Sequence, residues 1–221
     1  MKKQEKLDLD LFETKEEEAD FRAFFDDVLK KIPKKYAVIV KNSLAKTSKQ
    51  AEAFVKSRAE QFDKIFDDFL KDLDRDSRKK AHKIIHFASV TAAIVGFTPL
   101  PFADALLLVP IQLVMMTRLY AIFGESWSEG LTKSLAKEMV VVGLGRSAVG
   151  NLLKFIPAVG TIAGGVINAS VASIITESLG WVTVKMLHDG EDIFDQIMSF
   201  RGQFNLLFSS LSKASKSKNK K

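Results

Sequence analysis

The first clear hydrophobic pattern in the chain begins after residue 14, where apolar side chains recur with the 3.6-residue period of an α-helix. Thr14 and Glu17 have the spacing of a capping box, in which both side chains accept hydrogen bonds from free backbone amides of the first turn. Pro33 ends the pattern, because proline breaks a helix interior. The apolar positions are Phe21, Phe24, Phe25, Val28, Leu29 and Ile32. They predict one amphipathic helix.

Two further amphipathic helices are predicted. The first covers residues 35–73, with or without a break, and its apolar stripe consists of Ala51, Phe54, Val55, Arg58, Phe62, Ile65, Phe66, Phe69 and Leu73. The second covers residues 191–211, with Ile193, Phe194, Ile197, Met198, Phe204, Leu207, Phe208 and Leu211 on one face. Each stripe needs an apolar partner, since the opposite face is polar.

The middle of the chain is nearly uncharged. Residues 84–103 carry no formal charge, and Pro99 and Pro101 interrupt this stretch, so a tight turn is predicted there. Asp104 then lies near the start of the next helix, where a carboxylate is stabilised as a cap by the backbone amides. That helix is expected to pass through Pro110 and to end at Gly124.

Residues 155–176 form a second uncharged stretch, which is long enough to cross a bilayer as a helix. Pro157 predicts a turn near its start. Gly160, Gly164, Gly165 and Asn168 are candidate helix-packing residues, because small residues let backbones approach and an amide bonds across the contact. A buried hairpin in a soluble bundle uses small residues in the same way, so both interpretations stay open.

No strand-like alternation of any length is present, and we therefore predict an all-α fold. The expected architecture is a helical bundle with apolar, Gly/Ala-rich helical hairpins flanked by amphipathic helices. The predicted divisions are a disordered N-terminus (1–13), an amphipathic helical region (14–76), an apolar helical core (77–188), an amphipathic C-terminal helix (189–211) and a disordered basic tail (212–221).

The net charge of +6 is concentrated in clusters of lysine. Seven lysines and no acidic residue lie between Val28 and Ala51, and further basic clusters precede the apolar middle and end the chain. Such clusters suit an anionic surface, whereas solvated helix faces are the simpler explanation of any one of them. The candidate lipid-binding residues are Lys30, Lys31, Lys34, Lys35, Lys79, Lys80 and Lys83.

The residue types that enzymes require are not arranged in a catalytic pattern. The chain has no cysteine, which excludes disulfides and thiolate chemistry. Gly124 and Gly130 do not have P-loop spacing relative to Lys133, and the glycines at 143–150 depart from a dinucleotide loop. His82 and His86 share a helix face, but no acid completes a metal motif around them. We therefore expect no catalytic activity, no cofactor and no metal, and the N-terminal residues lack the apolar segment of a signal peptide.

Residues 98–181 contain a Pro-x-Pro turn (Pro99, Pro101) that leads into Ala-Asp-Ala (103–105), then Gln112, and a Lys-x-Ile-Pro-x-Val-Gly turn (154–160) before a Gly/Ala-rich helix. In these features the segment resembles the bacterial YcjF-like domain of unknown function, which is often found behind a small GTPase domain. The resemblance implies a helical, membrane-associated module that works with GTPase-type or membrane-remodelling partners. This chain carries no recognisable GTPase motif, so nucleotide hydrolysis would come from a separate protein.

Two functions are weighed. The first is a membrane-associated bacterial protein, at the cytoplasmic face of the membrane, that binds anionic lipid and a partner such as a GTPase. The alternative is a soluble, cytoplasmic helical adaptor whose apolar hairpins form its own core and which is able to open and insert into membranes. Self-association is compatible with both. Nucleic-acid binding is disfavoured, because the lysines lack interleaved arginine and stacking aromatic residues.

Overall fold

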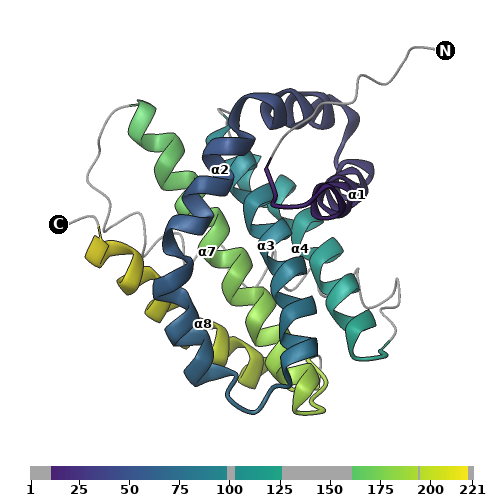
Figure 1. The fold of residues 1–221 in the computed structure, drawn as a ribbon, viewed down its shortest axis with the longest axis vertical. Coiled ribbons are helices and arrows are strands. Elements are labelled where there is room, and N and C mark those ends of the chain that lie inside the picture. Colours follow the sequence, from purple (N-terminus) through teal and green to yellow (C-terminus); the bar gives the residue numbers. More distant parts are fainter. Residues whose placement is uncertain (1–10, 99–102, 126–160, 194, 219–221) are drawn as a thin grey trace.

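The computed structural model describes residues 11–98, 103–125, 161–193 and 195–218. These residues fold into helices and turns, without a strand, and the predicted all-α class is confirmed. The helices are α1 (Lys15–Lys31), α2 (Lys34–Phe69), α3 (Arg75–Phe97), α4 (Ala103–Ile122), α7 (Thr161–His188) and α8 (Ile197–Lys218). The α7 helix passes through the middle of the bundle, with α2 and α8 on one side and α3 and α4 on the other (Figure 1).

Local sequence signals explain several helix ends. The Thr14 hydroxyl accepts a hydrogen bond from the Glu17 amide at 3.1 Å, as the capping box predicts. The α3 helix starts at Arg75, two residues before the predicted beginning of the apolar core at residue 77, because the Asp74 carboxylate caps it by accepting from the Ser77 amide at 2.9 Å. Gly124 ends α4 with a φ of +74°, a conformation that glycine adopts without steric cost.

The α2 helix is continuous over 36 residues and has no break. The C-terminal half of α2 places Val55, Phe62 and Phe66 in the core, so the apolar stripe predicted for this helix packs within the same chain. The α1 helix lies against α3 and α4, where Phe21 contacts Phe87 with ring centroids 5.6 Å apart. Amphipathic helices therefore cover the apolar ones, which is the arrangement that their patterns require.

Two segments that the sequence predicted to be disordered are partly ordered. Leu11 is buried, and the Phe12 ring lies 5.0 Å from that of Phe21 and 5.2 Å from that of Phe87. At the other end, α8 continues to Lys218, so residues 212–218 are helical. Leu211 is buried and anchors this last part of the helix on the core, which explains why the pattern extends past the predicted end.

The core is centred on α3 and α7. Every residue from 171 to 184 is buried, as is every residue from 87 to 96. The two helices approach most closely at Gly96, where an added Cβ would lie 2.5 Å from the Cα and N atoms of Ala169. Gly180 makes a second close approach, since its Cβ would meet the side chain of Ile85 at 2.6 Å.

The predicted packing residues of α7 only partly explain this contact. Gly165 does face α3, with Phe97 Cδ1 at 3.7 Å from where its Cβ would be. The prediction placed the Asn168 side chain across the helix contact, but Asn168 is exposed and its side chain does not lie there. The contact instead uses the backbone at Asn168 and Ala169, because Gly96 leaves room for it. Gly164 lies in the first turn of α7, and Gly160 is outside the described residues.

Candidate functional site

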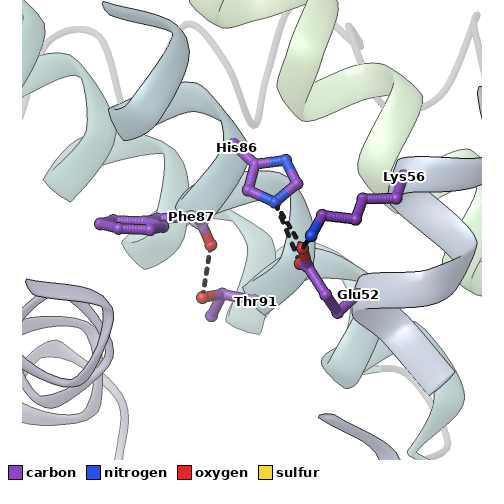
Figure 2. A network of polar contacts seen from close by, with 5 residues as sticks. All are labelled: Glu52, Lys56, His86, Phe87 and Thr91. Atoms are coloured by element: carbon purple, nitrogen blue, oxygen red, sulfur yellow. Dashed lines mark hydrogen bonds and ion pairs between the residues drawn. The ribbon is translucent and has the colours of Figure 1, made fainter. Parts of the chain in front are cut away.

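A polar cluster lies inside the bundle, where α2, α3 and α7 meet. Glu52 of α2 is 5% exposed, and both of its carboxylate oxygens lie 3.0 Å from His86 Nε2 on α3. Lys56 Nζ approaches the same carboxylate from the surface at 3.5 Å (Figure 2). The Thr91 hydroxyl, also in Figure 2, donates to the Phe87 carbonyl of its own helix at 2.8 Å. Glu52 thus joins two helices through a largely buried contact.

Arg58 carries the second buried charge of the cluster. It is 4% exposed, and its Nη2 donates to the Ser173 hydroxyl of α7 at 2.7 Å. Its guanidinium carbon lies 4.3 Å from the centroid of the Phe54 ring and 5.3 Å from that of Phe62, a cation–π geometry. Arg58 Nε has no hydrogen-bond partner within the described part of the chain. Arg58 therefore ties α2 to α7 with part of its hydrogen-bonding capacity unused.

Glu177 of α7 is the third charged member and the least satisfied. It is 7% exposed, and its Oε2 finds no hydrogen-bond partner in the described part of the chain. Burial raises the pKa of Glu177 to about 7, while the charges of Arg58 and His86 lower it by smaller amounts. A carboxyl group with this pKa is partly protonated near neutral pH, so the cluster changes its charge in the physiological range.

A small cavity of about 30 Å³ opens beside this cluster, lined by Val55, Ala59, Phe62, Asp63, Phe66, His82, Ile85, His86, Glu177 and Trp181. It has room for about one water molecule and is too small for an organic substrate. The rings of His82 and His86 stack with centroids 6.0 Å apart, and Trp181 lies 6.1 Å from His82. His82 keeps an exposed surface, yet the partial burial of its ring and the nearby His86 lower its pKa.

These side chains do not form a metal centre. Within the described ranges, no group of three histidine or acidic residues is arranged to hold a metal ion. Glu52, Arg58 and His86 instead make polar contacts between helices, in addition to the apolar packing and to the surface ion pair of Asp67 on α2 with Arg78 on α3. The cluster is therefore suited to fixing the relative positions of α2, α3 and α7, and to making that arrangement sensitive to pH.

Glu52 contacts two partners, the largely buried His86 and the exposed Lys56, and their contributions to the free energy of unfolding can be compared. Glu52→Ala is expected to lower the free energy of unfolding by about 2 kcal/mol, because His86 loses a buried hydrogen bond to a charged group. Lys56→Ala removes the other partner, whose side chain is 53% exposed, and is expected to change stability by less than about 0.5 kcal/mol. Urea unfolding of both variants measures the difference. Equal losses would show that the Glu52–His86 contact contributes nothing beyond a surface ion pair.

The candidate lipid-binding lysines fall into two separate groups. Lys30, Lys31, Lys34 and Lys35 are exposed where α1 meets α2, and Lys79 and Lys80 are exposed in the first turns of α3. These places lie at opposite ends of α2 (Figure 1). Lys83 forms an ion pair with Asp20 of α1. The structure therefore does not gather the seven lysines on one surface. It also pairs Lys83 with an acidic residue of the same chain.

Three of the predicted turn residues, Pro99, Pro101 and Pro157, lie outside the described residues. Asp104 is the second residue of α4, a position in the first turn as predicted. Pro110 is inside the same helix, which continues beyond it to Ile122.

One helix in the described ranges, within Gly165–His188 of α7, is long and apolar enough to cross a membrane. The core helix of a soluble protein meets the same criteria, and most of this segment is buried by neighbouring helices. In the folded bundle, α7 is thus the central core helix.

The site and fold together define a class of protein: an all-α bundle built around two apolar helices, with charged side chains buried at their contact with a third. Residues 61–204 match the protein family described as "Domain of unknown function (DUF697)", and the chain belongs to this family. The matched segment includes residues 98–181, on which the resemblance rested.

The chain is also similar to "Magnetosome membrane protein 22" of Magnetospirillum gryphiswaldense, with 37% identity over 112 residues. The alignment covers 49% of this chain and 56% of the relative, so the chain spans little more than half of that protein's length. No solved structure matches the chain.

Sequence reasoning did not identify Glu177 or Glu52 as site residues, and it placed Arg58 only within the Phe-rich stripe. A signal for Glu177 was present. Glu177 directly follows the uncharged stretch 155–176 and is the one acidic residue between Glu138 and Asp189. An isolated acid within apolar sequence indicates burial or function. No comparable signal distinguishes Glu52 from the other acids of α2.

Proposed function

We propose that this chain is a membrane-associated helical protein without catalytic activity, which binds anionic lipid and a partner protein such as a separate GTPase. The observation that carries the proposal is the 37% identity over 112 residues to a protein named as a magnetosome membrane protein. The exposed lysines at the surface of the bundle give it physical support. The GTPase partner rests on the resemblance of residues 98–181 to the YcjF-like domain.

The folded bundle favours docking on the membrane over spanning it. Residues 171–184 of α7 are all buried by other helices, and drawing this helix into lipid would uncover their apolar faces. It would also move Glu177 into hydrocarbon, where an ionisable group is costly. Contact between the membrane and the outer, basic surfaces requires no such rearrangement. We also propose the cytoplasmic face of a bacterial membrane as the place of action.

A soluble adaptor is the second candidate, and the packing of α7 is the observation in its favour. The polar faces of α1, α2 and α8 give the bundle a coat that water tolerates. In this case the exposed surfaces bind a protein, and membrane contact requires the bundle to open.

Sedimentation of the purified protein with vesicles distinguishes these functions. Neutral and anionic vesicles are compared, and the pellets are washed with high salt and then with alkaline carbonate. We expect pelleting with anionic vesicles that high salt reverses, since exposed lysines contribute about 1 kcal/mol each near an anionic surface. Pelleting that survives carbonate would instead indicate insertion of apolar helices. The absence of pelleting with either vesicle would reject the membrane proposal in favour of the soluble adaptor.

A further inference from the structure

The outer surface of the first turns of α2 combines exposed aliphatic side chains with exposed lysines. Val38 and Ile39 are 61% and 39% exposed, although most large apolar residues of the described chain are buried. Lys34, Lys35 and Lys41 are exposed around them. Since residues three or four apart are neighbours on a helix, Lys34, Lys35 and Lys41 all adjoin Val38. We call residues 34–41 the α2 tip.

The opposite face of the same helix fixes the direction of this surface. Val40 and Leu44 are buried, and Ser48 and Ala51 continue the buried row at helical spacing. The helix cannot rotate to hide Val38 without exposing this row. The outward row is formed by residues 34, 38, 41, 45 and 49, all exposed, and reads Lys-Val-Lys-Ala-Lys. The α2 tip thus presents its aliphatic side chains to the surroundings because of how α2 packs.

The charge of this surface indicates an anionic partner. No acidic residue occurs between Val28 and Ala51, and of the seven lysines in this segment only Lys30 forms an ion pair in the described part of the chain, with Asp27 at 2.9 Å. Lys35 Nζ lies 4.6 Å from the centroid of the Tyr36 ring, which leaves the cation available to a further anion. Both phosphate-rich polymers and lipid headgroups are anionic. The aliphatic Val38 and Ile39 have no favourable contact with a phosphate backbone, whereas the boundary between headgroups and acyl chains accepts them.

We propose that the α2 tip is the surface by which the folded protein docks on anionic lipid, with Val38 and Ile39 entering the boundary between headgroups and acyl chains. Lys34, Lys35 and Lys41 then contact lipid phosphates beside them. The inference rests on the proposed membrane association and specifies its site. The lysines at the start of α3 do not take part, since no exposed large apolar residue lies among them.

The absence of cysteine allows a direct test of insertion. Val38→Cys is labelled with an environment-sensitive fluorophore and titrated with vesicles of phosphatidylcholine, with or without phosphatidylserine. Met198→Cys on α8 is the matched control, because Met198 is 75% exposed. We expect a blue shift of the label at position 38 with anionic vesicles and none at position 198. Equal shifts at both positions, or a shift at 198 alone, would overturn the proposal.

Binding of unlabelled variants then separates this inference from the proposed function. The double change Val38→Asp with Ile39→Asp is expected to weaken binding to anionic vesicles at least about tenfold, since it removes the inserted aliphatic groups. Lys34→Glu with Lys35→Glu is expected to weaken it by a similar factor. Met198→Asp with Leu206→Asp changes two apolar residues of α8 that are 75% and 72% exposed, more than Val38 and Ile39, and is expected to leave binding within about twofold.

All the changed side chains are at the surface, so each variant is expected to fold. Circular dichroism of each variant checks that the helical bundle is intact. If the α2 variants bind anionic vesicles as the wild type does and Lys79→Glu with Lys80→Glu abolishes binding, the α2 tip is not the docking surface. The proposed membrane association would then still stand. Failure of the wild-type chain to bind anionic vesicles would reject the proposed function itself.

Discussion

Gly96→Ala is expected to destabilise the bundle by about 3 kcal/mol, because the added methyl group has no space between α3 and α7. Its Cβ would lie 2.5 Å from Ala169 Cα and N, and 2.7 Å from the Asn168 carbonyl carbon. These are backbone atoms, so the two helices must move apart along the centre of the core. Interiors are close-packed, and such a separation loses contacts along both helices.

The same substitution at Gly202 is the matched control. Gly202 also lies within a helix, but nothing is within 4 Å of its added Cβ. Alanine has a higher helix propensity than glycine, so Gly202→Ala is expected to stabilise the protein by about 0.5 to 1 kcal/mol. Gly180→Ala is expected to fall between these variants, since the atoms that it meets belong to the side chains of Ile85 and Met115. Thermal and urea unfolding measure all three. A neutral Gly96→Ala would show that α3 and α7 are not in the described contact.

Glu177→Gln is expected to stabilise the protein at pH 8 and to remove part of its pH dependence. Burial raises the pKa of Glu177 from an ordinary 4.5 to about 7, so the folded state binds a proton that the unfolded state has released between these values. The folding cost of Glu177 is therefore absent below pH 4.5, grows as the pH rises, and is complete above about pH 7. At about 1.4 kcal/mol per pH unit, this cost is roughly 3 kcal/mol.

The measurement is the difference in free energy of unfolding between Glu177→Gln and the wild type, from urea titrations at several pH values. The difference is expected to increase in favour of the variant from pH 4.5 to about pH 7 and then to level off. Titrating groups that do not interact with Glu177 act equally on both proteins and cancel, whereas His86, whose charge lowers the pKa of Glu177, contributes to the difference. The same difference is then measured with Arg58→Met in both proteins. The charge of Arg58 lowers the pKa of Glu177, so without it the increase of the difference is expected to extend to higher pH. A difference that is constant with pH would contradict a raised pKa for Glu177.

The sequence predicted the helical class and most helices, because the 3.6-residue pattern of Phe21, Phe24 and Val28 is a local signal. The caps and terminating residues are local signals too, and Thr14 and Gly124 act as expected. The position of the closest helix contact was predicted less well. The small residues Gly160, Gly164 and Gly165 drew attention to this stretch of the sequence, whereas the closest contact is made by Gly96 on α3. Which glycine meets which backbone depends on helix register, and one helix alone does not specify it.

The site was harder to predict than the fold. Glu52 and Asp68 are both acids on a charged helix, yet Glu52 is buried beside His86 and Asp68 is exposed. Only the position of α3 and α7 distinguishes them. Similarly, Lys83 belongs to a basic cluster in sequence, but the approach of α1 pairs it with Asp20. Interactions between distant segments decide these roles, and a sequence pattern contains no direct record of them.

The central place of α7 also constrains how the protein forms. Its principal neighbour α3 ends at Phe97, whereas α7 begins at Thr161, so the core contact joins segments that are distant along the chain. During synthesis, α1 to α4 leave the ribosome before the helix that covers the surface around Gly96 exists. Until α7 emerges, the apolar side chains of α3 on that surface are exposed to any other apolar surface nearby. Correct folding is therefore favoured if α3 avoids other partners until α7 has left the ribosome.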